Sequence, residues 1–274
     1  MIFNKTEGNI LFAMLKVSLF LFINFLNSIA YNSIILKQKT IKKPSYLTGF
    51  IYFILSLPLS NLENNVVIII SSFLLINLYG NIINLNQTHG IKKTILKISF
   101  FLACLLIIDF QFILFFPLIL GTLFYYQQFN WKNVIIQLLS IVYVIGTFYA
   151  FAFLLFSSTT WVGGMIQNIN YLKLLNYPIV ITLFITLLFA FTELNKNFYK
   201  KTESSKKGFY ILFCFFLITI ASVIMFRSFN FAYLITIPAT IVISNYLIYT
   251  KYKKFRTFLL GLLIILFILK FLYP

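Results

Sequence analysis

The five acidic residues of this chain are the first candidates for chemistry, because carboxylates act as general bases and metal ligands. Two of them, Glu63 and Asp109, each lie in a short polar break between strongly apolar runs. In a membrane protein, ionisable groups at such positions are costly to desolvate and are usually paired or functional. Glu63 and Asp109 are therefore the candidate catalytic residues. The alternative is that each carboxylate simply reaches headgroups and water at the membrane boundary.

The remaining acids and the single histidine have simpler explanations. Glu193 and Glu203 flank a lysine-rich stretch and balance its charge, and Glu7 lies in the polar N-terminal segment. His89 is the only histidine, which excludes metal centres that need several imidazole ligands. We therefore expect no metal site and no cofactor.

Composition places the chain in a membrane. It is 61% hydrophobic and only 10% charged, and its mean hydropathy is +0.96. A soluble domain carries about 25% charged residues, so this chain has too little polar surface to cover a water-soluble globule. No soluble domain, linker or repeat is visible, and residues 1–274 are expected to form one integral membrane domain.

Apolar runs separated by short polar breaks predict an all-α, polytopic transmembrane helix bundle with about ten membrane segments. Only helices and closed barrels cross a bilayer, because backbone groups find no water in its core. The predicted segments are 10–36, 46–60, 66–85, 94–108, 112–126, 134–156, 174–194, 209–226, 231–249 and 258–272. The two runs beside Asp109 are near the lower limit of about 17 residues for crossing. Residues 93–127 therefore either cross twice or re-enter as a helical hairpin.

The positions of the basic residues agree with these polar breaks. Of the 22 lysines and arginines, 17 lie in the breaks after the first, third, fifth, seventh and ninth segments, 4 lie on the opposite side, and Lys16 lies within the first segment. Cytoplasmic loops carry an excess of lysine and arginine, so the lysine-rich breaks are predicted to face the cytoplasm and both termini to face outward. The net charge of +17 thus indicates topology, and no nucleic-acid partner is expected.

Arg227 is one of the four basic residues on the predicted outer side. It could be the counter-ion of Asp109 or Glu63. It could also bind an anionic ligand such as a lipid phosphate, because a guanidinium group holds phosphate through two parallel hydrogen bonds. The third alternative is that Arg227 is an ordinary loop arginine.

Four stretches of the chain carry a family resemblance. They are Phe3-Asn4-Lys5-Thr6, the stretch from Pro58 to Asn65, the two short runs around Asp109, and Pro238 with Ser244-Asn245-Tyr246-Leu247. On these the chain resembles an uncharacterised multi-pass inner-membrane family of Bacteroidota, a domain of unknown function. The resemblance implies a bacterial cytoplasmic membrane and brings no known activity. Its relatives have an extra N-terminal span, which leaves the orientation of the N-terminus open.

A more distant resemblance is to class C glycosyltransferases, polytopic enzymes that use lipid-linked sugars. These enzymes carry an acidic residue in an early outward loop, where it acts as a general base or binds a metal. Glu63 would be its counterpart here.

Three functions from different classes remain after these observations. The first is a membrane subunit or scaffold whose partners are membrane lipids and other membrane proteins. The second is a glycosyltransferase-like enzyme that handles polyprenyl-phosphate-linked substrates at the outer face through Glu63 or Asp109. The third is a transporter, for which no inverted repeat and no acid pair at mid-membrane is visible. The expected location is the bacterial inner membrane, or the mitochondrial inner membrane if the chain is organelle-encoded.

Overall fold

The computed structural model describes residues 10–37, 41, 45–59, 65–86, 90–156, 176–226, 233–250 and 253–272. Within these ranges the chain is all-α and contains no strand, which confirms the all-α part of the predicted fold class, whereas the number of about ten membrane segments stays a prediction. Glu63, His89 and Arg227 lie outside the described residues, so the roles expected for them stay predictions.

The described helices follow the order of the predicted apolar segments, one helix for each segment. They are α1 (Ile10–Lys37), α2 (Leu47–Leu59), α3 (Asn65–Asn84), α4 (Ile91–Ile108), α5 (Phe115–Tyr125), α6 (Trp131–Phe156), α7 (Asn176–Asn197), α8 (Glu203–Phe226), α9 (Thr236–Tyr249) and α10 (Lys253–Leu272). The short 3-10 helices η2 (Phe110–Leu114) and η3 (Phe198–Lys200) precede α5 and follow α7. Four stretches are long and apolar enough to cross a membrane, and they are Val17–Lys37, Val67–Asn84, Trp131–Leu155 and Ser205–Ser222.

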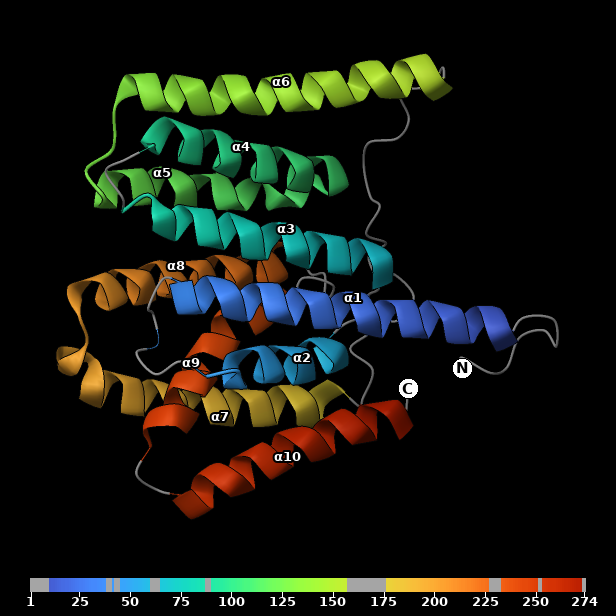
Figure 1. Cartoon of the computed structure of the whole chain (residues 1–274), viewed down its shortest axis with the longest axis vertical. Helices are drawn as coiled ribbons and strands as arrows, with labels where there is room; N and C mark the ends of the chain where they lie inside the picture. The colour runs from blue at the N-terminus through green and yellow to red at the C-terminus, as the bar shows by residue number, and fades with distance from the viewer. Residues whose placement is uncertain are drawn as a thin grey trace.

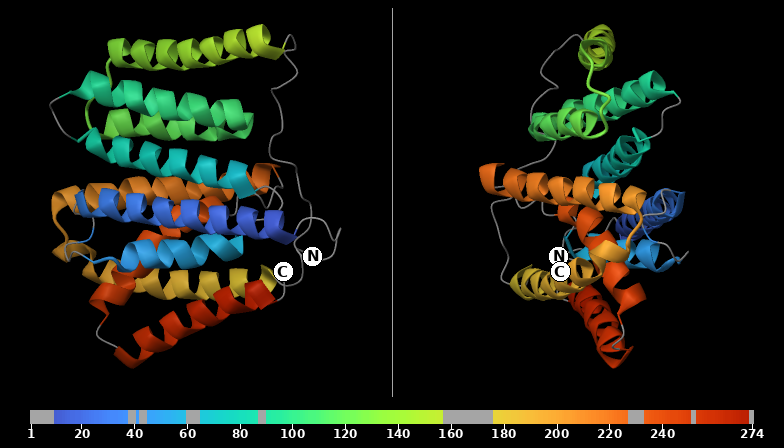
Figure 2. Two further views of the ribbon diagram at one scale, coloured as in Figure 1. Left: turned by 45° about the vertical axis from the view of Figure 1, so that its right-hand side comes forward. Right: turned by 90° about the vertical axis from the view of Figure 1, so that its left-hand side faces the viewer.

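Successive helices alternate in direction, with α1 to α8 roughly along one common axis and α9 and α10 inclined to it (Figures 1 and 2). The last residues of α1, α3, α5, α7 and α9 therefore lie at the same end of the bundle as the first residues of α2, α4, α6, α8 and α10 (left in Figure 1). We call this the basic end. Helix α6 lies at the margin of the bundle and packs chiefly against α4, so most of its apolar surface remains exposed.

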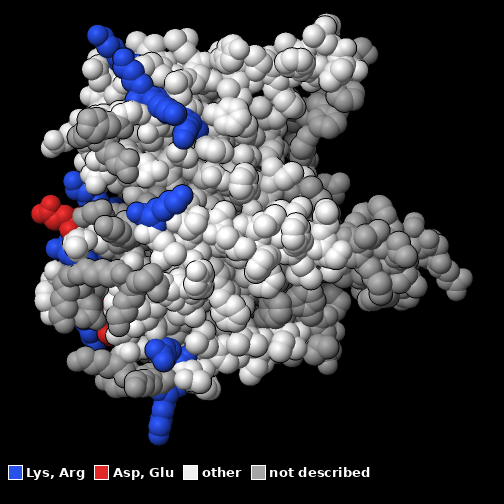
Figure 3. All heavy atoms as spheres, in the orientation of Figure 1, with Lys and Arg blue, Asp and Glu red and all other residues white. Residues whose placement is uncertain are grey.

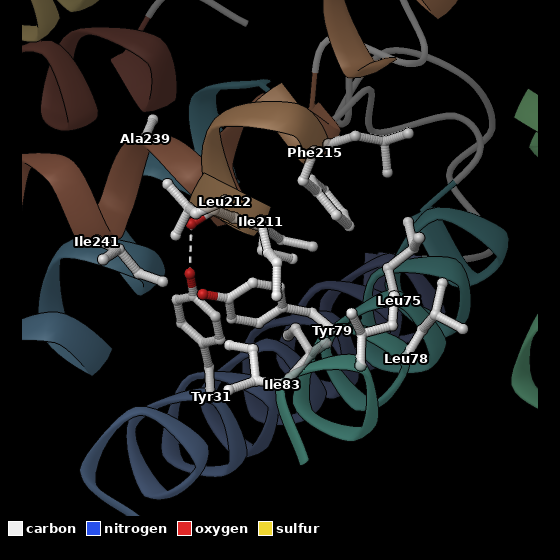
Figure 4. Close-up of a cluster of buried hydrophobic side chains, with 14 of the residues drawn as sticks. Tyr31, Leu75, Leu78, Tyr79, Ile83, Ile211, Leu212, Phe215, Ala239 and Ile241 are labelled. Atoms are coloured by element: carbon white, nitrogen blue, oxygen red, sulfur yellow. Dashed lines mark hydrogen bonds between the residues drawn. The ribbon is translucent and has the colours of Figure 1, made fainter. Parts of the chain in front are cut away.

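Helix α9 lies at the centre of the second half of the bundle, against α2, α7 and α8. Every residue from Thr236 to Leu247 is buried, the small polar ones included, which explains why this segment does not pair one apolar stripe with a charged, solvent-facing one. Pro238 lies in the first turn, where its missing N–H leaves no helical hydrogen bond unmade. The Tyr31 hydroxyl of α1 donates to the Ile237 carbonyl oxygen (Figure 4), and this bond ties α9 to the first helix.

Helices α1 and α2 pack closely at Gly49. A Cβ atom added there would lie 2.9 Å from the Ser28 carbonyl oxygen and 3.2 Å from the Asn32 Cβ. The first contact is with backbone, which cannot rotate away as a flexible side chain would. Gly146, on the exposed helix α6, has no heavy atom within 4 Å of the equivalent position.

These two glycines allow a matched test of the packing. Gly49→Ala should lower the free energy of unfolding in detergent by roughly 1–3 kcal/mol, because it overpacks the α1–α2 contact. Gly146→Ala should be neutral or stabilising by up to about 1 kcal/mol, because alanine has the higher helix propensity. Thermal melting of the purified protein measures both. Equal melting points for the two variants would show that α1 and α2 do not pack as described.

Candidate functional site

Lysine and arginine side chains gather at the basic end, on the left edge of the surface in Figure 3. Every one that the structure describes lies near the end of an odd-numbered helix, within the first two turns of an even-numbered helix, or in the turn between η3 and α8. These residues are Lys37, Lys92, Lys93, Lys97, Lys132, Lys196, Lys201, Lys206, Lys207, Lys254 and Arg256. Glu193 and Glu203 lie at the same end, as the charge-balance reading expected, whereas Asp109 lies at the opposite end.

A groove of about 1070 Å³ opens at the basic end between α3, α4 and α6, beside the last turn of α1. We call it the basic groove. Its polar lining consists of Lys37, Asn77, Asn81, Asn84, Lys93, Lys97 and Ser140. Its apolar lining consists of Ile34, Leu96, Phe100, Phe101, Leu139, Tyr143 and Val144, with Gly80 between the polar residues of α3.

Helical spacing explains why these residues meet. Asn77, Asn81 and Asn84 are four and three residues apart, which places them on one face of α3. Lys93 and Lys97 share a face of α4 in the same way. Gly80 permits α1 to approach α3 here, because a Cβ atom on it would lie 3.1 Å from the Ile34 side chain.

The groove has a positive electrostatic potential. Lys37, Lys93 and Lys97 are all exposed, and among the described lining residues none is acidic. The Asn77 amide donates one hydrogen bond to the Phe73 carbonyl oxygen at 2.9 Å, and the Asn81 amide donates one to the Asn77 carbonyl oxygen at 2.7 Å. Each NH₂ group carries two hydrogens, so each keeps a second donor for a ligand. Three ammonium groups with amide donors are suited to an anionic group such as phosphate or carboxylate.

The apolar wall of the groove faces outward from the bundle. Leu139 and Tyr143 of α6 are 64% and 71% exposed, and Leu96 and Phe100 of α4 are about half exposed. Exposed apolar side chains that adjoin a charged cluster form an amphipathic surface. The ligand that fits such a surface has an anionic head and an apolar tail.

Asp109 has a structural role at the opposite end of the bundle. Its side chain is 7% exposed, and its Oδ1 accepts a hydrogen bond of 2.9 Å from the Gln111 backbone N–H, so that it caps η2. Burial raises the pKa of the Asp109 carboxyl above its ordinary value, and the bond from Gln111 partly opposes this. This burial does not fit the alternative that the Asp109 carboxylate simply reaches headgroups and water.

The sequence-based candidates and the basic groove do not coincide. Glu63 and Arg227 lie outside the described residues, so the expected pairs of Arg227 with Asp109 or Glu63 stay predictions. The groove was missed because its residues come from four segments. One signal was present in the sequence: the asparagines at positions 77, 81 and 84 fall at helical spacing, just before the lysines at 93 and 97.

Comparison with known proteins identifies a family for this chain but does not indicate an activity. The model of a protein family of unknown function matches residues 3–273, nearly the whole chain. No curated protein and no solved structure matches the chain. The expectation of an uncharacterised family is thereby confirmed, whereas the likeness to class C glycosyltransferases stays a prediction.

Capping and ion pairing at Asp109 predict different mutational effects. Asp109→Ala removes the acceptor for the Gln111 N–H and should cost about 1 kcal/mol of stability, the usual effect of losing a cap. Asp109→Asn keeps a side-chain oxygen that can accept this bond and should cost less than half as much. Melting points in detergent compare the two variants. If Asn is as destabilising as Ala, the negative charge itself is needed, and a pair with Arg227 would explain it.

Proposed function

The chain belongs to this family of unknown function (DUF6427), and from its geometry we propose that it is a ten-pass membrane subunit that binds an anionic amphiphile. The amphiphile lies in the basic groove, with its charged head at Lys37, Lys93 and Lys97. The observation that carries this proposal is the groove itself, in which an acid-free lysine cluster adjoins an exposed apolar wall.

The alternation of the helices supports ten crossings. Each helix begins at the end where the preceding one finishes (Figure 1), and the described basic side chains all lie at one of the two ends. The shortest helices are α2, α5 and α9, with 13, 11 and 14 residues. A helix of about 20 residues is needed to span the hydrocarbon core alone. A shorter segment is tolerated where neighbouring helices cover its ends, and α9 is buried along almost all of its length.

The charge distribution supports the orientation. Lysine and arginine are enriched on the cytoplasmic side of membrane proteins, which supports a cytoplasmic position for the basic end. In a bacterial cell, the membrane concerned is the inner membrane. The basic groove then opens at the level of the inner-leaflet headgroups, where each lysine or arginine near an anionic membrane surface contributes about 1 kcal/mol to attraction.

Two kinds of lipid in such a membrane have the chemistry that this ligand needs. A phospholipid such as phosphatidylglycerol and a polyprenyl phosphate both combine a phosphate with a long apolar tail. The lysine ammonium groups and the free amide hydrogens of Asn77 and Asn81 would hold the phosphate. The tail would lie along Leu96, Phe100 and Tyr143 on the side walls of the groove. A ligand bound in this way would hold the subunit at a fixed depth in the leaflet.

Lipid titration tests the proposal. The purified protein in an uncharged detergent is titrated with phosphatidylglycerol, undecaprenyl phosphate or phosphatidylcholine, and bound lipid is counted by native mass spectrometry. We expect the two anionic lipids to bind more tightly than phosphatidylcholine, and the tighter of the two identifies the source. Lys93→Gln with Lys97→Gln should weaken anionic binding at least about tenfold, because two lysines contribute about 2 kcal/mol.

A matched pair of substitutions controls for the loss of charge. Lys196 and Lys254 are exposed lysines at the same end and do not line the groove. Lys196→Gln with Lys254→Gln removes the same charge and should change the affinity by less than about twofold. If this control weakens binding as much as the groove pair does, the lipid is attracted by the whole basic end, and the groove is not a site.

A further inference from the structure

The polar residues of the basic groove lie at two levels along the bundle axis. Helix α4 begins at the basic end, whereas α3 finishes there (Figure 1). Side chains of an α-helix lean toward its N-terminus, so Lys93 and Lys97 of α4 lean toward the basic end. Their long stems let the ammonium groups reach still further toward water. We call this the lysine level.

A second polar level lies deeper in the groove, and we call it the asparagine level. It consists of Asn77 and Asn81 of α3 with Ser140 of α6. Asn77 lies seven residues before Asn84, the last residue of α3, which is about 10 Å along the axis at a rise of about 1.5 Å per residue. Both asparagine side chains lean away from the basic end, because each amide donates to a backbone carbonyl oxygen one turn earlier in α3. Ser140 lies nine residues after Trp131, the first residue of α6.

Each residue of the asparagine level carries an oxygen that can accept a hydrogen bond. The amides of Asn77 and Asn81 turn their NH₂ groups to the backbone carbonyls, so their Oδ1 atoms do not face those carbonyls. The Ser140 hydroxyl uses its only hydrogen in a bond of 2.6 Å to the Ile136 carbonyl oxygen, so its oxygen can only accept. Among the described residues, none donates a hydrogen bond to these three oxygens.

A bound amphiphile would place the junction between its head and its tail at this level. Its phosphate would lie at the lysine level, and its tail along Phe100 and Tyr143. The ligand displaces water from the groove, and an acceptor that is then left without a donor lowers the affinity. The junction of a diacyl phospholipid contains ester carbonyl oxygens, which are acceptors themselves. Such a lipid would therefore leave the acceptors of the asparagine level unpaired.

We propose that the ligand of the basic groove carries hydrogen-bond donors at the junction between its phosphate and its tail. This inference rests on the proposed function, because the lysines must hold the phosphate. Two kinds of lipid have this chemistry. A ceramide-based phospholipid has an amide N–H and a hydroxyl at the junction, and a lysophospholipid has a hydroxyl there. A carboxamide suits both, because its oxygen accepts from the donor while its second N–H can donate to a carbonyl oxygen of the same lipid.

Lipids with one head group and different junctions test this proposal. Full-length protein in an uncharged detergent is titrated with ceramide phosphoglycerol and with phosphatidylglycerol, which share their head, their charge and two tails. A second pair is lysophosphatidylglycerol and its 2-deoxy analogue, which lacks only the hydroxyl. Native mass spectrometry gives the dissociation constants. We expect at least one donor-bearing lipid to bind at least fivefold more tightly than its partner, because one hydrogen bond changes affinity roughly two- to tenfold. The pair that shows the larger ratio identifies the kind of lipid.

Substitutions at the asparagine level test whether this preference arises there. Asn77→Leu with Asn81→Leu removes the carboxamides and keeps every lysine, so the ratio of affinities within the preferred pair should fall below about twofold. Asn86 supplies the control, because it is exposed and does not line the groove. Asn86→Leu should keep the wild-type ratio.

The outcomes separate this inference from the function on which it rests. If both lipids of each pair bind the wild-type protein equally, and more tightly than phosphatidylcholine, the groove binds anionic lipids but the inference is overturned. It is also overturned if the ratio survives in the double asparagine variant. If none of these lipids binds more tightly than phosphatidylcholine, the proposed function itself fails. The comparison on the wild-type protein needs no variant, so it decides the question even if the double variant does not fold.

Discussion

The free-energy cost of taking a lysine ammonium group out of water is the constraint on which the rest of this structure depends. The lysine and arginine side chains that the structure describes lie at one end of the bundle, and the chain brings them there because it returns to that end after every second helix. The direction of each helix, the place of each turn and the lateral position of the basic groove all follow from it. Because the charges concentrate at one end, they also create the positive potential that an anionic headgroup would meet there.

A second constraint acts on the interior. Helix α9 is surrounded by other helices, so its polar groups must find partners inside the protein or at its ends. The Ile237 carbonyl oxygen accepts the Tyr31 hydroxyl, and Asn245 accepts a hydrogen bond of 2.7 Å from the Lys201 ammonium. That ammonium also lies 4.4 Å from the centroid of the Phe209 ring. Contacts of this kind fix α9 between the first helices and the last, and they leave the tyrosine hydroxyls of the core enclosed.

The helices could be predicted from the sequence because each apolar run is bounded by polar or basic residues. The α3 run was expected at 66–85 and is observed as Asn65–Asn84, and the α6 run was expected from Val134 and begins at Trp131. The packing could not be predicted. Helix α9 is central and α6 is marginal, yet both are mostly apolar with a few polar residues, and their neighbours distinguish them.

The candidate sites were harder to predict than the helices, for a physical reason. The sequence singled out individual acidic residues, and it left Asp109 either catalytic, in contact with headgroups and water, or paired with Arg227. The cap bond of Asp109 with Gln111 depends on the turn geometry. The basic groove combines residues from α1, α3, α4 and α6, and each of these lysines alone resembles an ordinary topology signal. Only the arrangement of four helices converts them into one binding surface.

The most direct test of the alternating topology is cysteine accessibility in intact cells. Cys104 and Cys214 are free cysteines and are first replaced by serine. Single substitutions Lys132→Cys and Lys254→Cys then probe the basic end, and Ser158→Cys and Asn230→Cys probe the breaks after the sixth and eighth segments. With this topology, a membrane-impermeant thiol reagent should label positions 158 and 230 in intact cells, and positions 132 and 254 only after permeabilisation. Labelling at 132 or 254 as fast as at 158 in intact cells would contradict it.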